Sequence, residues 1–266
     1  MKKYTLKVYP NGMGRLGITM KRITTVIIIG IMCLVMFTGC AKEGNNTVAV
    51  DNKTTAITTD SVQADDKTKN TYTITCVKGN VDWNSVPTLS LDNILWEPDC
   101  GIRANAQICY DDAALYVHLS AVEKNIRAEY DSPLSPVYED SCLEFFFMPE
   151  GQNRYFNYEI NPNGCLYLEF GYDRYDRAAL YKEDYKTYFN IQTGRTSDGW
   201  EVYYSIPVEF IQIYYPEYKF SGSLLANVYK CGNKTEHKHY LSWNPVTSEK
   251  PDFHRVSDFG KMIFGS

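Results

Sequence analysis

Apolar and polar residues alternate with a period of two along much of the chain from Tyr72 onward. The pattern is clearest in residues 103–108 and 115–121, where Ala, Ile, Leu and Val take every second place. Such alternation is typical of antiparallel strands that bury one face. Asp111 and Asp112 lie between the two segments and favour a tight connection. We therefore expect two neighbouring antiparallel strands here.

Eight further segments have the composition of strands, and helical segments do not alternate with them. They are residues 140–147, 154–161, 165–171, 188–193, 200–206, 224–229, 239–243 and 260–264. A strong turn signal, Asn-Pro-Asn-Gly164, separates the second from the third. The one expected helix runs from Pro207 to Tyr214, with proline in its first turn. About ten strands with one short helix predict an all-β fold, an antiparallel β-sandwich of the jelly-roll type.

The first 39 residues have the features of a signal peptide. Lys21 and Arg22 precede the apolar run 25–37, which is shorter than the roughly 20 residues that a membrane-spanning helix needs. The run is followed by Thr-Gly-Cys40, and Phe-Thr-Gly-Cys resembles a bacterial lipobox with phenylalanine in the usual place of leucine. We expect cleavage after residue 39 and lipidation of Cys40. An uncleaved anchor and plain secretion are the alternatives, and all three export the domain.

Two stretches next to this signal are expected to take no part in the fold. Met20, followed by Lys-Arg, resembles the natural start of the signal, so that residues 1–19 are expected to be an upstream extension or the result of a wrongly set start codon. Residues 40–71 contain almost no large apolar side chain and cannot bury enough surface to become ordered. They are expected to form a linker that tethers a single domain, residues 72–266, to the membrane at the cell surface.

The formal net charge of the whole chain is −5. Residues 1–39 contain six basic residues and no acidic residue, so the remaining chain carries a charge of −11. Contacts with nucleic-acid phosphates need clustered Lys and Arg, and no such run occurs here. The composition therefore argues against a nucleic-acid partner.

Six of the eight cysteines fall within the predicted domain: Cys76, Cys100, Cys109, Cys142, Cys165 and Cys231. An exported chain permits disulfides. No pair shows the Cys-x-x-Cys spacing of a metal ribbon or a redox site. Because a domain of about 195 residues can bury a sufficient core without cross-links, reduced and buried cysteines are favoured over disulfides.

Two neighbouring predicted strands carry polar groups on one face and apolar groups on the other. In a strand that starts at Tyr138, one face carries Tyr138, Asp140, Cys142 and Glu144, and the other carries Leu143, Phe145 and Phe147. In the next strand, Asn157, Glu159 and Asn161 lie opposite Phe156, Tyr158 and Ile160. These carboxylates and amides either form a polar binding face or lie on a solvated side of the sheet.

Asn227 and Trp243 add an amide and an aromatic ring near the C-terminus. Trp243 directly precedes Asn-Pro, where a strand must stop. A tryptophan in such a place is either a core plug or a platform for a ligand. The other tryptophans are expected to lie in the core: Trp83, Trp96 and Trp200.

The order and spacing of these segments resemble a family 9 carbohydrate-binding module over nearly all of residues 72–266. The resemblance rests on Asn93 to Trp96, Tyr110 to Val117, Tyr138 to Phe146, Tyr155 to Gly164, Asn227 to Lys230, Ser242-Trp243, Pro251 to His254 and Phe259-Gly260. It implies a β-sandwich without catalytic residues that binds the ends of sugar chains and is often attached to xylanases. It also implies a carbohydrate partner, in the form of a mono- or oligosaccharide or a polysaccharide chain end.

The resemblance further implies that two aromatic rings sandwich one sugar. Tyr138 takes the place of the first ring, commonly a tryptophan, and Trp243 takes that of the second. Hydroxyl groups of the sugar would be held by Glu144, Asn157, Glu159 and Asn227. The chemistry suits a pyranose, because its C–H face packs on aromatic rings while carboxylates and amides bond its hydroxyls. The tyrosine at 138, and the lack of an arginine in residues 155–161, leave the preferred sugar open.

Other functions remain as alternatives. Glu144 and Glu159 are also a candidate carboxylate pair for a glycoside hydrolase, and the exposed sheet face is a candidate protein-binding surface. A zinc site at His237, His239, His254 and Cys231 is less favoured than ordinary roles for these residues. The resemblance allows structural calcium, with Asp111, Asp112 and Asp140 as candidate ligands, although no loop has EF-hand spacing. We expect a monomer that needs no cofactor.

Overall fold

The structure of the chain is a computed structural model that describes residues 7–10 and 69–266, with side chains described from residue 69 onward. The predicted lipidation site Cys40 lies outside the described residues, as do most of the predicted signal peptide and linker. Strand β1 (Lys7–Pro10) pairs antiparallel with β10 (Arg177–Tyr181), although no part in the fold was predicted for residues 1–19. The main described part begins at residue 69, and its first strand, β2 (Thr71–Cys76), follows directly.

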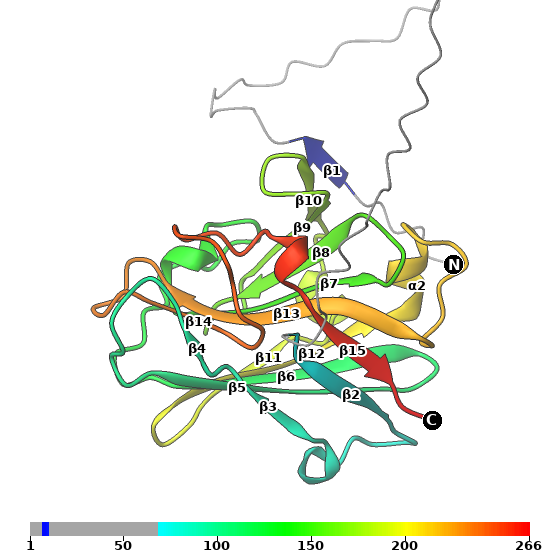
Figure 1. The fold of residues 1–266 in the computed structure, drawn as a ribbon, viewed down its shortest axis with the longest axis horizontal. Helices are drawn as coiled ribbons and strands as arrows, with labels where there is room; N and C mark the ends of the chain where they lie inside the picture. The colour runs from blue at the N-terminus through cyan, green and yellow to red at the C-terminus, as the bar shows by residue number, and fades with distance from the viewer. Residues whose placement is uncertain (1–6, 11–68) are drawn as a thin grey trace, which may run out of the picture. The chain divides into compact units, whose positions relative to one another are not determined.

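Two layers of strands face each other, with β7 and β13 in one layer and β5 and β6 in the other (Figure 1). The first layer, here called the β7 sheet, contains β10, β9 (Leu166–Gly171), β8 (Tyr155–Ile160), β7 (Cys142–Pro149), β13 (Ser223–Gly232), β14 (His239–Ser242), β4 (Asn93–Ile94) and β15 (Gly260–Phe264). The second, the β6 sheet, contains β3 (Thr88–Ser90), β5 (Arg103–Tyr110), β6 (Ala114–Val122), β12 (Gly199–Pro207) and β11 (Gln192–Arg195). Strand β2 joins the layers, because it pairs in parallel with β15 and then with β5.

The described helices are short. They are α1 (Tyr185–Tyr188), α2 (Val208–Gln212) and the 3₁₀ turns η2 (Trp83–Ser85), η3 (Val137–Glu139) and η4 (Val256–Asp258). Within the described part of the chain, no helix has the length and apolarity that crossing a membrane requires. The helix expected from Pro207 is α2, and Pro207 lies just before its first turn.

The predicted all-β sandwich is confirmed, and it has more strands than the alternation indicated. Besides β1, strands β2, β3, β4 and β10 are additional. Strands β3 and β4 have three and two residues, and β10 follows no clear alternation, whereas β2 alternates from Tyr72 but was not assigned as a strand. The strand expected at residues 188–193 is wrong in its first half, because α1 ends at Tyr188 and β11 begins only at Gln192. The strand expected from Tyr138 begins at Cys142, because residues 137–139 form the turn η3. The predicted β5–β6 hairpin is present, and Asp111 Oδ1 accepts hydrogen bonds from the amides of Ala113 and Ala114.

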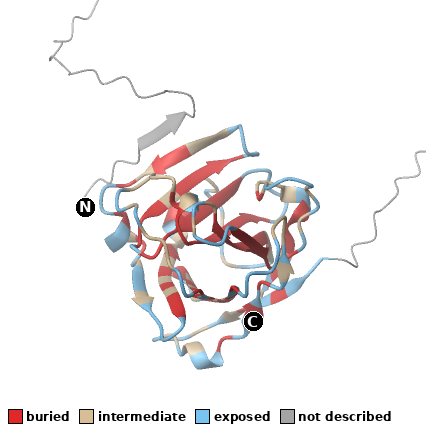
Figure 2. Ribbon diagram, turned by 90° about the vertical axis from the view of Figure 1, so that its left-hand side faces the viewer, coloured by how far each residue is buried: buried red, intermediate tan, exposed pale blue. Residues whose placement is uncertain are grey.

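The main core lies between the two sheets, and the strands at the centre of the molecule are buried along most of their length (Figure 2). Its largest fully buried members are Phe145, Phe147, Phe156, Tyr158, Phe189, Trp200 and Phe210. Trp200 is therefore a core residue, as predicted, whereas Trp83 and Trp96 are only half-buried. Burial of this many large apolar side chains is the dominant favourable contribution to folding.

A second apolar cluster covers the opposite face of the β7 sheet. It contains Phe146, Tyr155, Tyr229, Phe253 and Phe259, with cysteines among them. All residues of β7 and β8 are consequently buried, including the predicted polar face. The alternative of a solvated sheet face is therefore wrong, because the chain around residues 244–259 lies over it and contributes Phe253 and Phe259 to the cluster.

Trp243 belongs to the main core and does not face a ligand site. Its side chain is buried, and its ring approaches Gly260 so closely that a Cβ there would lie 2.7 Å from ring atom Cζ3. Its backbone amide donates a hydrogen bond to the Val228 carbonyl. The predicted sugar platform at Trp243 is therefore replaced by a core plug, which was the other reading of a tryptophan at a strand end.

A buried group of charged and polar side chains closes one end of the sandwich. Lys230 Nζ lies 3.1 Å from Glu123 Oε2 and 2.7 Å from His239 Nε2. His239 Nδ1 lies 2.7 Å from the His237 carbonyl oxygen, so this nitrogen carries the proton and Nε2 accepts from Lys230. Glu123 also accepts hydrogen bonds from Ser141 and Trp200. Burial, followed by the charge of Lys230, lowers the pKa of His239 to about 4.

The neutral state of His239 predicts an acid-dependent loss of stability. The unfolded chain, with an ordinary histidine pKa, binds more protons than the folded protein between pH 6.5 and 4, so stability falls as pH falls through this window. Between pH 7 and pH 5 this histidine should account for about 2 kcal/mol of lost unfolding free energy. In His239→Gln, which keeps an acceptor for Lys230, the loss measured by urea unfolding should be smaller by that amount. An equal loss in both proteins would contradict the assignment.

Candidate functional site

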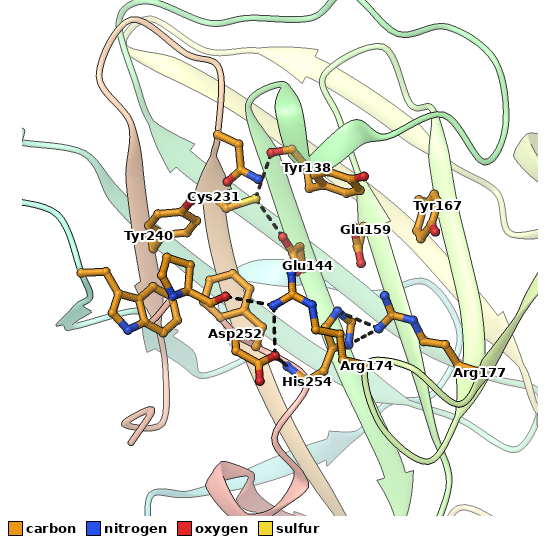
Figure 3. Close-up of a pocket in the computed structure, with 14 residues that line it drawn as sticks. Tyr138, Glu144, Glu159, Tyr167, Arg174, Arg177, Cys231, Tyr240, Asp252 and His254 are labelled. Carbon is orange, nitrogen blue, oxygen red and sulfur yellow. Dashed lines mark hydrogen bonds and ion pairs between the residues drawn. The ribbon is translucent and has the colours of Figure 1, made fainter. Parts of the chain in front are cut away.

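One pocket lies on the outer face of the β7 sheet and has a volume of about 220 Å³. It is lined by Trp96, Tyr138, Glu144, Glu159, Tyr167, Arg174, Arg177, Cys231, Asn233, Tyr240, Pro251, Asp252, Phe253 and His254. The strands supply the floor, and the segment from Pro251 to His254 supplies one wall (Figure 3).

The floor of the pocket follows from the register of four neighbouring strands. Tyr229 in β13 pairs with Glu144 in β7, Glu144 pairs with Glu159 in β8, and Glu159 pairs with Tyr167 in β9. Directly opposed residues of an antiparallel pair point to the same face. One row across the sheet therefore places two carboxylates side by side between two tyrosines.

Glu144 is buried on this floor, with 2% of its surface exposed. Its Oε1 accepts a hydrogen bond from Cys231 Sγ, 2.9 Å away. Burial raises the pKa of Glu144 well above its usual value, and the neighbouring Cys231 and Glu159 raise it further. The carboxyl group therefore favours its neutral form more strongly than an ordinary glutamate does.

Glu159 has a free oxygen in the same pocket. Its Oε1 accepts a hydrogen bond from Asn157 Nδ2 at 2.9 Å, whereas the buried Oε2 has no hydrogen-bond partner in the protein. Burial raises the pKa of Glu159 to about 7, with Arg177 acting in the opposite direction. A buried acceptor without a partner costs free energy, so this oxygen is ready to bond a group that enters the pocket.

Arg177 brings a positive charge to the pocket from strand β10. It forms an ion pair with Glu169 and lies 2.7 Å from His254 Nε2 through Nη1. The hydroxyl of Tyr155 lies 2.8 Å from Nδ1 of the same histidine. Burial, Arg177 and Arg174 together hold the pKa of His254 well below its usual value, so this imidazole is neutral.

Aromatic rings stand on two sides of the carboxylates. Tyr138 packs edge to face against Tyr167, with ring centroids 6.1 Å apart. On the other side, Trp96 packs against Tyr240 and Phe253, with centroids 5.2 and 5.4 Å away. Figure 3 shows Tyr240 and Tyr167 on opposite sides of Glu144. The pocket thus combines flat apolar surfaces with polar groups that converge from below.

Three of the predicted binding residues meet in this pocket: Tyr138, Glu144 and Glu159. Tyr138 reaches it from the turn η3 and not from a strand, and its side chain remains exposed. Asn157 lies behind Glu159 as its hydrogen-bond partner and does not line the pocket. The pocket therefore contains the predicted carboxylates and only the first of the two predicted rings.

Asn227 and Trp243 do not line the pocket, so their predicted contacts with a sugar are corrected. Asn227 Nδ2 donates to the carbonyls of Asn244 and Asp258, and its Oδ1 accepts from the amides of Val228 and Asn244. All of its hydrogen-bonding capacity is thus used within the protein. Asn227 positions the chain that covers the β7 sheet, whereas Trp243 fills the core.

The pocket also contains residues that the sequence did not indicate. Tyr167 lies on a predicted strand, and the alternation of that strand could have indicated which face its side chain is on. Arg177 comes from β10, which was not predicted. Trp96 was expected in the core, and it instead lines the pocket, with its indole Nε1 donating to the Ser248 carbonyl. The arginine missing from residues 155–161 is supplied by β10 and by Arg174 in the loop before it.

Most of the residues considered as zinc or calcium ligands make other contacts in the structure. His239 bonds Lys230 inside the sandwich, His254 bonds Arg177, and His237 is exposed. Asp111 caps the β5–β6 turn. Asp140 accepts hydrogen bonds from the amides of Glu129 and Tyr130. The expectation of structural calcium stays a prediction.

All six cysteines of the described part are free thiols. Four of them are buried, as expected for a reduced domain: Cys109, Cys142, Cys165 and Cys231. Cys76 and Cys100 are exposed, which differs from that expectation.

Comparisons with known proteins agree with this architecture. No curated protein matches the sequence. A Bacteroides uniformis protein described as a candidate carbohydrate-binding protein is similar in structure, with a TM-score of 0.64 and 24% identity over 74% of this chain and 100% of that one.

A family 9 carbohydrate-binding module of Caldicellulosiruptor kristjanssonii is similar in two solved complexes. Its glucose complex has a TM-score of 0.53 and 15% identity over 74% of this chain and 96% of that one. Its cellotriose complex has a TM-score of 0.52 and 14% identity over 73% of this chain and 93% of that one. At these identities the likeness concerns the fold. The model of carbohydrate-binding family 9 matches residues 75–264, well over half of the sequence, and the chain therefore belongs to carbohydrate-binding family 9.

Proposed function

We propose that the pocket on the β7 sheet binds one terminal sugar ring of an oligosaccharide or polysaccharide chain, without catalysis. The observation that carries this proposal is the unpartnered Oε2 of Glu159, buried between aromatic rings and beside Glu144. Membership of a carbohydrate-binding family supports it, as do the glucose and cellotriose bound by the similar module.

The proposed contacts follow from the chemistry of a pyranose. Its C–H face would pack against Tyr138 on one side or against Trp96 and Tyr240 on the other, which removes apolar surface from water. Its hydroxyl edge would bond Glu144 and Glu159, which accept hydrogen bonds when ionised and both donate and accept them when neutral. Arg174, with nearly half of its side chain exposed, is placed to bond a hydroxyl at the pocket mouth.

The geometry favours binding over hydrolysis. A glycosidase places its two carboxyl groups on either side of the bond that it cleaves. Glu144 and Glu159 instead rise side by side from the same floor as a cross-strand pair, whose Cβ atoms are about 4.5–5.5 Å apart. They would therefore contact one edge of the sugar together.

The predicted export is part of the proposal. The signal-like segment and the Thr-Gly-Cys40 sequence support attachment through a lipid on Cys40, with residues 41–70 as a spacer between the membrane and the domain. This arrangement would hold the sugar-binding domain at the cell surface, where polysaccharide fragments are encountered.

Substitution of the pocket residues should weaken sugar binding. In calorimetric titrations with glucose, xylose, cellotriose and xylo-oligosaccharides, Tyr138→Ala should weaken binding about tenfold, because covering one ring face contributes roughly 1.5 kcal/mol. Glu159→Gln should weaken it by a similar factor or more, because a charge-assisted hydrogen bond is lost. Tyr203→Ala, on the opposite sheet, is the control and should bind as wild type does. Failure of wild type to bind any of these sugars would refute the proposal.

Incubation with cello- and xylo-oligosaccharides should release no reducing ends above a blank. The physical reason is the placement of both carboxyl groups on one side of the bound ring. Chromatography of the products after prolonged incubation provides the measurement. Sustained release by wild type that disappears in Glu159→Gln would establish a hydrolase instead.

Lipid attachment should depend on Cys40. Cells expressing the full chain and fed a labelled fatty acid should yield labelled protein in the membrane fraction, whereas Cys40→Ser should yield none. Cys33→Ser, in the apolar run, is the matched control and should remain labelled. Equal labelling of wild type and Cys40→Ser would contradict this assignment.

A further inference from the structure

Cys142, Cys231 and Glu144 converge beside the pocket. Cys142 in β7 is directly opposite Cys231 in β13, and Glu144 lies two residues further along β7 on the same face. One ligand atom from each side chain, two sulfurs and a carboxylate oxygen, lies within 4.8 Å of the other two. All three side chains are buried, with at most 2% of their surface exposed. Within residues 69–266 this is the one group of metal-ligating side chains that converges in this way.

The ligand types indicate which metal ion would fit. Thiolates select zinc and other soft or borderline ions and disfavour calcium and magnesium, which prefer oxygen ligands. Two sulfur ligands at the usual zinc distance of about 2.3 Å in a tetrahedral site are roughly 3.8 Å apart. The observed convergence within 4.8 Å therefore needs only small side-chain rotations to hold one ion.

A fourth ligand position would face the pocket. Cys231 and Glu144 line the pocket, whereas Cys142 does not. An ion held by all three would therefore lie on the pocket floor with one side toward the opening. Asn233 also lines the pocket, and its buried Oδ1 has no hydrogen-bond partner in the protein. A water molecule in the pocket would complete a tetrahedral set.

We propose that Cys142, Cys231 and Glu144 bind one zinc ion, or an ion of the same ligand preference, on the floor of the pocket. The site does not require the proposed sugar binding, because its ligands come from two paired strands of the sheet. Metal binding requires both thiols and the Glu144 carboxyl in their deprotonated forms, so the two thiol protons, and the carboxyl proton where Glu144 is neutral, are released to water. The bound ion would also protect this pair of thiols from oxidation in an oxidising compartment.

Zinc binding to wild-type protein tests the site directly. Protein purified with a reductant, freed of metal by a chelator and titrated with zinc against a chromophoric chelator should bind one equivalent. Cobalt should give a sulfur-to-cobalt charge-transfer band. Absence of a stoichiometric zinc site in wild type would overturn the proposal without reference to any variant. A disulfide between Cys142 and Cys231 in protein purified without a reductant, found by peptide mass analysis, would overturn it as well.

Variants then assign the ligands. Loss of a group that only hydrogen-bonds a metal ligand costs about 10–100-fold in metal affinity. Loss of a ligand itself should cost more, so the zinc affinity of Cys142→Ser and of Cys231→Ser should each fall at least about 100-fold. Cys165→Ser is the matched control, because Cys165 is a buried cysteine of the same apolar cluster and its thiol donates to the Ser132 carbonyl, as a serine can. It should bind zinc as wild type does. Unchanged affinity in both cysteine variants, with native circular dichroism, would place the metal elsewhere and refute the site.

Discussion

The chain from residue 244 to residue 258 lies over the outer face of the β7 sheet and is held there by buried hydrogen bonds. Asn227, fully buried in β13, bonds the backbone of Asn244 and Asp258, and the side chain of Asn244 donates to the Asp258 carbonyl. The carboxylate of Asp258 in turn accepts from the amide of Thr247 and from Arg255. Because buried polar groups without partners are costly, these paired groups fix one position for the segment. Without this cover the sheet would have one solvated face and no pocket.

This cover changes the chemistry of the residues below it. Glu144 and Glu159 would titrate as ordinary glutamates on a solvated sheet, but burial raises the pKa of both. Arg177 offsets part of this effect for Glu159 and is itself paired with Glu169. The same segment contributes Phe253 and His254 to the wall. The burial of both carboxyl groups and one of the aromatic rings of the pocket thus depend on this segment.

Strand β13 contributes buried polar side chains to both faces of the β7 sheet. Lys230 points into the sandwich and pairs with Glu123, whereas Cys231 points outward and donates to Glu144. Adjacent residues therefore take part in two separate buried polar groups, one that closes the core and one that lines the pocket. A shift of register by one residue would exchange the two sets, so the pairing of β13 with β7 is strongly specified.

The amino-acid sequence by itself determined the all-β fold, most strands and the face on which Glu144 and Glu159 lie, because strand periodicity is a local property. It did not determine that this face is covered. Trp243 illustrates the difference, since a tryptophan at a strand end fits both a platform and a core plug, and only the close packing against Gly260 decides between them. Likewise Arg177 and Trp96 reach the pocket from segments distant along the chain, and Cys142 meets Cys231 only through the register of β7 and β13. These contacts depend on which strands pair and where loops cross, and no local pattern of residues carries that information.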